Sequence, residues 1–503
     1  MVLPSRSAAT ARLPLVALTA TSAALLATRV FAAARVGFGD SEALYASYAL
    51  HPQAAYLDHP GLVGFVARVL GGGTAPSPLR AHLVTAIAAT AFPWLLALAC
   101  RACGSTWSRA LAAALVAALA PEIAVGLFAL TPDLLLSLAW TGAIGLAALG
   151  LRAAPGSGRA SLAFAGAGLL AGVAVASKMT GLALFAALAI AYASRPARPH
   201  GRTIAPWAGL AAGAVVLVPI VAFEVRTGWP MLRHRLVDTQ GDAGFSVRNA
   251  GALLGGQLVY LSPLVAVLAA IAAREAWRGR EDAIGRLLWS CFVVPLTVLV
   301  PLCLWSRVAE PHWIAPALIA LVPAVARASY APSRRLVAAS CGVAAAMVAA
   351  VHAWVLVPDA VLLAPASYDP RLDLSSELQG WPEAMAAVRE EVHAASIAGP
   401  DGGDQGDLAV VGPHWVICAQ LEAALRDQVP VGCDTPVADD FDFWWPRARW
   451  RSADVVVWVS DARFGPPTLL MHAPLRQREV RIERAGRLVR VFTITVLARR
   501  AQA

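Results

Sequence analysis

The chain has 503 residues, of which 58% are hydrophobic and 15% charged, and its mean hydropathy is +0.62. Soluble domains carry about a quarter of charged residues, so this composition excludes an ordinary soluble protein and predicts a membrane protein. The net charge of +9 does not indicate nucleic-acid binding, because the arginines stand in short loops and form no stripe interleaved with aromatic residues.

Apolar runs long enough to cross a bilayer, about 20 residues each, recur from the N-terminus to about residue 357. The first run is longer than the apolar part of a signal peptide, which has about 7 to 15 residues, so we predict a retained helix. Eleven spans are predicted, at 13–34, 82–100, 108–128, 132–150, 161–176, 179–194, 206–225, 251–273, 286–305, 312–329 and 336–357.

The charges of the connecting loops predict the topology, because short cytoplasmic loops hold an excess of arginine. With the N-terminus in the cytoplasm, every inside loop is basic. These loops hold Arg101 and Arg109, Arg152 and Arg159, Arg195 to Arg202, Arg274 to Arg280, and Arg327 to Arg335. The odd number of spans then places residues 358–503 outside the cytoplasm.

Two domains are therefore expected, a membrane domain over 1–357 and an extracytoplasmic domain over 358–503. The first outer loop, 35–81, contains the amphipathic pieces "EALYASYAL" and "GLVGFVARVLGG". Their apolar residues recur at helical spacing, and such pieces lie in the plane of the membrane interface.

The C-terminal segment reads as a small α/β domain. A strand is predicted at 407–413, a helix at 414–427, a second strand at 453–461 and a hairpin over 478–500 around an Ala-Gly turn. The first turn from strand to helix lacks a glycine-rich phosphate loop, which argues against nucleotide binding. Cys418 and Cys433 can form a disulfide if this domain lies outside the cytoplasm.

Ionisable residues converge on the outer face of the predicted membrane domain. Charged groups are costly to place at or in a membrane, so such a convergence marks candidates for a functional site. The candidates are Asp40, Glu42, Asp58, His59, Asp133, Lys178, Arg233, Arg235, Glu310 and His312.

Some of these residues have a second interpretation. Asp133 follows Thr131 and Pro132 at the start of a span, so its carboxylate fits either a site or the positive end of a helix dipole. Lys178 is either an interfacial lysine that reaches outward or an anion-binding group, and its place on the outer side favours anion binding. Arg233 and Arg235 are typical of a solvated basic loop or of a phosphate site.

Asp40 and Glu42, in "GDSEALY", supply two neighbouring carboxylates at the membrane surface. Such a pair can act as a general base or help to hold a divalent cation. Asp58 and His59 add a third carboxylate and an imidazole. These are the groups needed to activate a hydroxyl or amine acceptor beside a phosphate leaving group that basic residues neutralise, so the predicted substrate is a lipid-borne phosphate.

Five segments in order resemble a known family: "GDSEALYASYALHPQAAYLDHPGLVGF", "TPDLLLSLAW", "ASKMTGLALF", "GGQLVYLSPL" and "EPHWIAPALIAL". They are similar to the bacterial GT-C glycosyltransferases of the protein O-mannosyltransferase and aminoarabinose transferase superfamily (glycosyltransferase family 39-like), over roughly 15–330. The resemblance implies an α-helical polytopic membrane protein of the GT-C fold with a C-terminal extracytoplasmic domain. It also implies inverting transfer of a sugar from a polyprenyl phosphate.

The resemblance assigns the catalytic base to Asp40 or Glu42, which Ser41 separates here, and Asp40 is the preferred candidate. Asp58 and His59 match the family's second acidic motif. Asp133, Lys178 and Glu310 match polar positions at the outer ends of helices. Some members use a divalent metal ion, for which the sequence offers no complete ligand set.

The resulting hypothesis is a bacterial inner-membrane enzyme that transfers the sugar to a lipid or protein acceptor on the periplasmic side. Lys178 with Arg233 or Arg235 would hold the donor phosphate, and Asp58, His59 and Glu310 would shape the sugar site or hold a metal ion. His312 is a further candidate for substrate binding. A transporter of lipid-linked saccharides is an alternative that would place charges at the membrane midplane. A non-catalytic scaffold would tolerate neutralisation of the outer charges.

Overall fold

The computed structural model describes residues 6–241, 243–306, 310–330, 332–397, 407–426, 428–467 and 469–500. The chain divides into two compact units. The membrane unit comprises Met1–Val30, Ala54–Leu62 and Val84–Ala350. The C-terminal unit comprises Phe31–Gln53, Val63–Leu83 and Val351–Ala503, so it includes two pieces of the loop 35–81, which was predicted to be the first outer loop.

The predicted α-helical polytopic fold is confirmed. Among the described residues, six helices are long and apolar enough to cross a membrane: α1 (Arg6–Ala33), α4 (Pro78–Ala102), α7 (Pro132–Arg152), α8 (Gly158–Ser177), α16 (Ala283–Trp305) and α19 (Arg334–Leu356). Four bent pairs of helices bring the candidate spans to as many as ten. The eleventh predicted span, 312–329, corresponds to the shorter apolar segment Pro311–Arg327, which consists of η5 (Pro311–Ile314), α17 (Ala315–Ile319) and α18 (Leu321–Arg327).

A proline stands in the first turn after the break in each of the four bent pairs. Proline has no backbone N–H and is tolerated there, where that donor would lack a partner in the helix. The pairs are α5 (Trp107–Leu119) with α6 (Pro121–Ala124) and η1 (Gly126–Phe128); η2 (Met179–Gly181) and α9 (Leu182–Ala193) with η3 (Arg195–Ala197) and α10 (Arg198–Gly201); α11 (Ala205–Val215) with α12 (Val218–Thr227); and α14 (Val247–Tyr260) with α15 (Pro263–Arg278).

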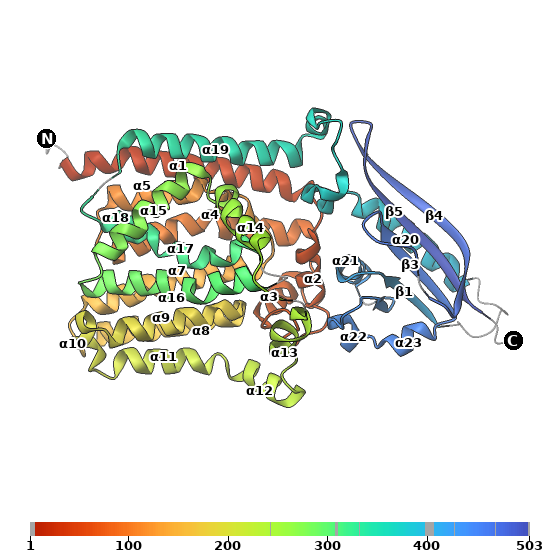
Figure 1. The fold of residues 1–503 in the computed structure, drawn as a ribbon, viewed down its shortest axis with the longest axis horizontal. Helices are drawn as coiled ribbons and strands as arrows, with labels where there is room; N and C mark the ends of the chain where they lie inside the picture. Colours follow the sequence, from red (N-terminus) through yellow and green to blue (C-terminus); the bar gives the residue numbers. More distant parts are fainter. Residues whose placement is uncertain are drawn as a thin grey trace. The chain divides into compact units, whose positions relative to one another are not determined.

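Small residues let the membrane helices pack closely. Helix α8 lies between α7 and α11 (Figure 1) and contacts both. Gly168 and Gly172 of α8 face Gly209 and Gly213 of α11, and a Cβ atom on any of the four would collide with a backbone carbonyl oxygen of the facing helix. Glycines four residues apart permit such close approach in membranes, where packing drives helix association. Helix α8 ends at Ser177, and Lys178 follows it.

The C-terminal unit is built on a five-stranded sheet, drawn in blue in Figure 1. The strands are β1 (Leu408–Gly412), β2 (Val431–Cys433), β3 (Val455–Asp461), β4 (His472–Arg484) and β5 (Arg487–Arg499), in the order β2-β1-β3-β5-β4. Strand β1 pairs in parallel with β2 and β3, and β5 pairs antiparallel with β3 and β4. The strands predicted at 407–413 and 453–461 and the hairpin are thus confirmed. Ala485 and Gly486 form its turn with φ of 47° and 76°, the left-handed conformation that two-residue hairpin turns need.

Helices complete the C-terminal unit. The helix predicted at 414–427 is α21 (Trp415–Leu425), and α2 (Asp40–Ser47) of the first outer loop packs against it. Gln420 donates a hydrogen bond of 2.7 Å to the carbonyl oxygen of Phe38, and Tyr48 donates one of 3.0 Å to Asp440. The remaining helices of this unit are α3 (Leu62–Gly71), η6 (Pro358–Leu363), η7 (Pro370–Leu372), η8 (Leu374–Leu378), α20 (Trp381–Ile397), α22 (Asp440–Trp444) and α23 (Arg447–Arg451).

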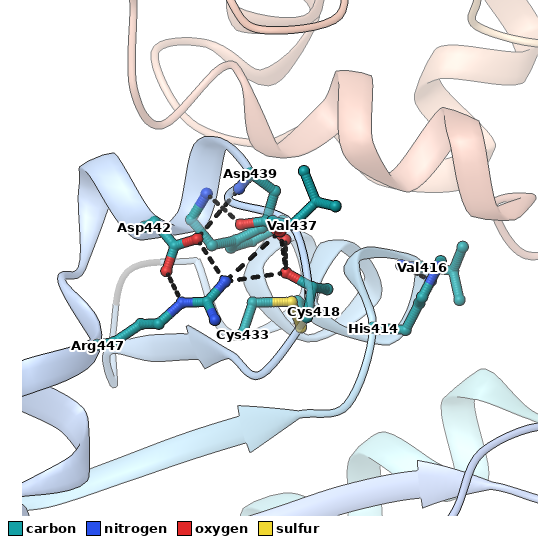
Figure 2. Close-up of a disulfide and its surroundings, with 10 residues drawn as sticks. His414, Val416, Cys418, Cys433, Val437, Asp439, Asp442 and Arg447 are labelled. Atoms are coloured by element: carbon teal, nitrogen blue, oxygen red, sulfur yellow. Dashed lines mark hydrogen bonds and ion pairs between the residues drawn. A yellow bond between two sulfur atoms is a disulfide. The ribbon is translucent and has the colours of Figure 1, made fainter. Parts of the chain in front are cut away.

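A disulfide joins Cys418 of α21 to Cys433 at the end of β2, as the sequence suggested (Figure 2). Beside it, Arg447 binds both oxygens of Asp442 at 2.5 and 2.8 Å. Asp439 accepts a hydrogen bond from the backbone N–H of Phe441 and caps α22. Arg447 also donates to the hydroxyl of Thr435 and to the backbone carbonyl of Val437, so it contacts the loop between β2 and α22 that the disulfide anchors at Cys433.

Candidate active site

The predicted site residues fall into two groups, one in each unit. Asp40 and Glu42 belong to the C-terminal unit. The remaining candidates belong to the membrane unit: Asp58, His59, Asp133, Lys178, Arg233, Arg235, Glu310 and His312.

Lys178 and Asp133 form the centre of the membrane-unit group. The ammonium group of Lys178 donates to both carboxylate oxygens of Asp133, at 2.8 and 3.0 Å. Packing of α7 against α8 brings the two together, since Asp133 lies in the first turn of α7 and Lys178 follows α8. The side chain of Lys178 is only 8% exposed, so it does not reach outward into the interface. A buried charge of this kind needs its partner.

His312 extends this pair. Its Nε2 atom lies 3.9 Å from an oxygen of Asp133, and its Nδ1 atom lies 3.1 Å from Glu310. The hydrogen bond from His312 holds the pKa of Glu310 below its usual value. The ring of Trp313 lies 5.9 Å from the ammonium nitrogen of Lys178, within range of a cation-π interaction.

Asp58 recruits one of the two candidate arginines. Arg235, on α13 (Pro230–Leu236), contacts the Asp58 carboxylate at 2.9 Å and donates to its backbone carbonyl at 3.2 Å. Arg233 instead pairs with Asp238 at 3.5 Å, and its side chain is 72% exposed. Of the two arginines considered from the sequence, Arg235 is therefore the one that lies in the group.

His59 lies close enough to both Arg235 and Lys178 to be influenced by their charges. It is buried, and burial lowers its pKa well below the usual value. The nearby positive charges of Arg235 and Lys178 lower this pKa further. Burial therefore favours the neutral imidazole of His59, which can donate or accept a hydrogen bond without adding charge.

Sequence reasoning missed two ionisable residues inside the predicted spans, of which Arg29 is buried. Glu122, on α6, experiences the charges of His312, Asp133 and Lys178. Arg29, on α1, donates to the hydroxyl of Thr90 at 2.8 Å and to the backbone carbonyls of residues 123 and 124 at 2.8 and 2.9 Å. Ionisable residues within a span are themselves a signal of function, and that signal was available from the sequence.

Glu42, in the C-terminal unit, has both oxygens engaged. One accepts a hydrogen bond of 3.0 Å from the backbone N–H of Gly39, which is the capping-box interaction at the start of a helix. The other lies 2.9 Å from the Nε2 atom of the buried His82. This carboxylate holds the start of α2 and His82 in place.

Asp40 is held differently. Its Oδ2 atom accepts a hydrogen bond of 2.7 Å from Arg463. Its Oδ1 atom is buried and has no hydrogen-bond partner among the residues that the structure describes. Burial raises the pKa of Asp40, and the charge of Arg463 is the largest opposing influence. A carboxylate with a raised pKa and a free oxygen is suited to accept a proton.

The partners of Asp40 continue into the β-sheet. Asp461, at the end of β3, accepts hydrogen bonds from Arg463 and from Arg490 of β5. Glu377 accepts a hydrogen bond of 3.4 Å from the backbone N–H of Asp40. Burial, together with the charge of Asp40, raises the pKa of Glu377 to about 7. None of these C-terminal partners was predicted, because they lie more than 330 residues from Asp40 in the chain.

The residues present do not fit a bound metal ion. The carboxylates of Asp133, Asp58 and Asp40 are each paired with a cationic side chain. Within the described part of the chain, no group of three or more His, Cys, Asp or Glu side chains is arranged to hold a metal. The expected alternative of a metal site near His59 and Glu310 thus has no support from the donor set.

A model of a known family matches part of the chain. Residues 58–223 match the family model described as dolichyl-phosphate-mannose-protein mannosyltransferase, and this segment contains Asp58, His59, Asp133 and Lys178. None of the curated proteins compared with the chain matches it.

Solved structures of similar fold include two that contain a lipid phosphate. The first is ArnT from Cupriavidus metallidurans bound to undecaprenyl phosphate, with a TM-score of 0.58, 16% identity, and coverage of 95% of this chain and 97% of that one. The second is the archaeal oligosaccharyltransferase AglB from Archaeoglobus fulgidus in complex with an inhibitory peptide and a dolichol-phosphate. Its TM-score is 0.52, its identity 14%, and coverage is 89% of this chain and 69% of that one.

At these identities the structural likeness establishes the fold. The fold and the family match together support a multi-pass membrane glycosyltransferase of the GT-C superfamily. The resemblance predicted from the five sequence segments is thereby confirmed at the level of the superfamily.

Proposed function

We propose that the protein transfers a sugar from a polyprenyl-phosphate carrier to a lipid or protein acceptor, with inversion at the anomeric carbon. The observation that carries this proposal is the buried ion pair of Lys178 and Asp133, with His312, His59 and Arg235 around it. The cationic groups of Lys178 and Arg235 suit a phosphate that gains charge as its bond to the sugar breaks. The ArnT and AglB structures of similar fold contain undecaprenyl phosphate and dolichol-phosphate.

Lys178 and Arg235 are the proposed phosphate-binding groups. Asp133 holds the ammonium group of Lys178 in place through two hydrogen bonds, and Asp58 does the same for Arg235. Because both cations are positioned before the donor binds, they need no rearrangement when charge develops on the leaving phosphate. His59 and His312 would contact the sugar or the phosphate as hydrogen-bond donors.

Asp40 is the proposed general base. Its free oxygen accepts the proton of the acceptor hydroxyl or amine, whose oxygen or nitrogen then attacks the anomeric carbon. The carbon–oxygen bond to the phosphate breaks, and the polyprenyl phosphate leaves with the electron pair. Displacement from the face opposite the phosphate gives the inverted product. In this scheme Glu42 has a structural role, because it caps the start of α2.

The reaction is assigned to the periplasmic side of a bacterial inner membrane, with the N-terminus in the cytoplasm. The alternation of arginine-rich loops supports this orientation. The disulfide between Cys418 and Cys433 supports an oxidising compartment for the C-terminal unit.

The test is donor cleavage by the purified protein in nanodiscs. The protein is supplied with membrane extract as acceptor and a panel of radiolabelled polyprenyl-phosphate sugars, and the release of free polyprenyl phosphate is measured. Wild type should consume at least one donor, Lys178→Met should lose most of this activity, and the exposed Arg233→Gln should retain it. If wild type cleaves none of the donors but moves labelled donor across the membrane of proteoliposomes, the protein is a transporter and the proposal is wrong.

A further inference from the structure

Arg463 lies in the C-terminal unit and bonds directly to the proposed base. Its Nη1 atom donates to Oδ2 of Asp40 at 2.7 Å, and the chain separation of the two residues is 423 positions. We propose that Arg463 is a positioning residue that holds one oxygen of Asp40 and leaves the other as the proton acceptor. This inference rests on the role proposed for Asp40.

The position of Arg463 is itself fixed by a second ion pair. Its Nε atom donates to both oxygens of Asp461 at 3.1 Å. Arg490 binds the same carboxylate at 2.7 and 3.1 Å. The Nη1 atom of Arg490 donates to the backbone carbonyls of residues 376, 377 and 379. Because guanidinium groups are planar and hold their donors in a fixed fork, this chain of bonds from backbone to Asp40 defines one direction for the carboxylate.

Arg463 also controls the charge of Asp40. Burial disfavours the ionised carboxylate, and the groups that face Asp40 are Arg463, Arg490, Asp461 and Glu377. The charge of Arg463 lowers the pKa of Asp40 and opposes burial most strongly. The charge of Asp461 raises this pKa, as burial does. Without Arg463 the pKa of Asp40 would therefore rise further. A general base works only when it is ionised. As the pH is lowered, an enzyme without Arg463 would therefore lose activity at a higher pH than wild type does.

A matched control lies beside Arg463. Arg371 lines the same cavity of about 250 Å³ as Arg463, Asp461 and Arg490. Arg371 is exposed, and its ion-pair partner within the described part of the chain is Asp369. Removing its charge changes the net charge of the cavity by the same amount without breaking a bond to Asp40.

The experiment compares Arg463→Gln, Arg463→Lys and Arg371→Gln with wild type in the donor-cleavage assay, over the whole pH range in which wild type is active. For Arg463→Gln, the acidic limb of kcat/KM should move upward by about 1 to 3 pH units, the usual effect of one nearby opposite charge. Activity should recover at high pH, Arg463→Lys should shift less, and Arg371→Gln should match wild type. A pH-independent loss in Arg463→Gln would overturn the inference, as would an unshifted profile.

A second measurement is independent of transfer. Thermal unfolding of Asp40→Asn, Arg463→Gln and the double variant gives a thermodynamic cycle. The inference predicts that the two single shifts in Tm are not additive, because each substitution breaks the same bond. If the two shifts in Tm are additive, Asp40 and Arg463 do not interact and the inference is wrong. If wild type cleaves no donor, the proposed function fails, and this cycle still decides whether Arg463 holds Asp40.

Discussion

The two units hold their central aspartates in opposite ways. In the membrane unit, Lys178 binds both oxygens of Asp133. In the C-terminal unit, Arg463 binds one oxygen of Asp40, and the other oxygen has no partner within the described residues. The same residue type thus acts as an anchor for a cation in one unit and is free to accept a proton in the other.

The environment of each carboxylate determines this difference. Asp133 lies at the start of α7, beside Lys178 and His312. Asp40 lies at the start of α2 among two arginines and two further carboxyl groups, Asp461 and Glu377. Pairs of carboxyl groups whose different surroundings give them different pKa values and different roles are typical of catalytic sites. Substitutions in the two groups should therefore affect different steps of the reaction.

The largest effect is expected for Asp40→Asn. Loss of a general base costs about 10²- to 10⁴-fold in rate, so transfer should fall by about 10³-fold at saturating donor. Glu42→Gln should retain most activity, because glutamine also completes a capping box. The measurement is the initial rate of label transfer with both variants. Equal losses in the two variants would place Glu42 in the chemistry and contradict the distinction between them.

Lys178→Met should lower donor cleavage by about 10²-fold, the cost of removing one preorganised group that stabilises developing charge. Asp133→Asn should also reduce activity, because it leaves Lys178 without its ionic partner, and Lys178→Arg should retain part of it. Rates measured at several donor concentrations separate the loss of binding from the loss of turnover. If Lys178→Met behaves as wild type, the membrane-unit group does not hold the phosphate.

The adjacent arginines provide a smaller and more specific test. Arg235→Gln should raise KM for the donor by about tenfold, because a charge-assisted hydrogen bond contributes about 1.5 kcal/mol. Arg233→Gln removes the same charge from the same helix at an exposed position and should change KM little. A larger effect of Arg233→Gln than of Arg235→Gln would show that the site is formed differently from the arrangement seen here.

The smallest effect on transfer is expected from the disulfide. Replacing Cys418 and Cys433 with serine removes a crosslink between residues 15 positions apart, which stabilises a folded domain by about 3 kcal/mol. The Tm of the C-terminal unit should fall, while the rate at low temperature changes little, because the Asp40 carboxylate is held by Arg463 and not by the crosslink. If the double serine variant has the same Tm as wild type under oxidising conditions, the disulfide between Cys418 and Cys433 is contradicted.

Much of the membrane fold could be predicted from hydropathy alone. The spans predicted at 132–150 and 286–305 correspond to α7 and α16, because long apolar runs must bury their backbone polar groups in a helix. The breaks were not predicted: the run at 108–128 is bent by 76° between α5 and the helix that begins at Pro121. The proline was visible in the sequence, but the hydropathy of the run remains continuous across it.

The site was predicted in part. Asp133 and Lys178 were both singled out, yet their direct pairing depends on the packing of α7 against α8, which periodicity does not reveal. The pairing of Asp40 with Arg463 was beyond reach for a similar reason, since it joins the first outer loop to the end of a strand 423 positions later. Glu122 and Arg29 were missed because the apolar residues around them dominate the average hydropathy.

The most direct test of the division of labour is to measure binding and transfer in the same samples. Purified wild type, Lys178→Met and Asp40→Asn are titrated with undecaprenyl phosphate in nanodiscs and then assayed for sugar transfer. Asp40→Asn should bind the lipid phosphate as wild type does and transfer sugar about 10³-fold more slowly, whereas Lys178→Met should lose binding. If Asp40→Asn loses binding as Lys178→Met does, or transfers sugar at the wild-type rate, the separate roles assigned to the two aspartate environments are wrong.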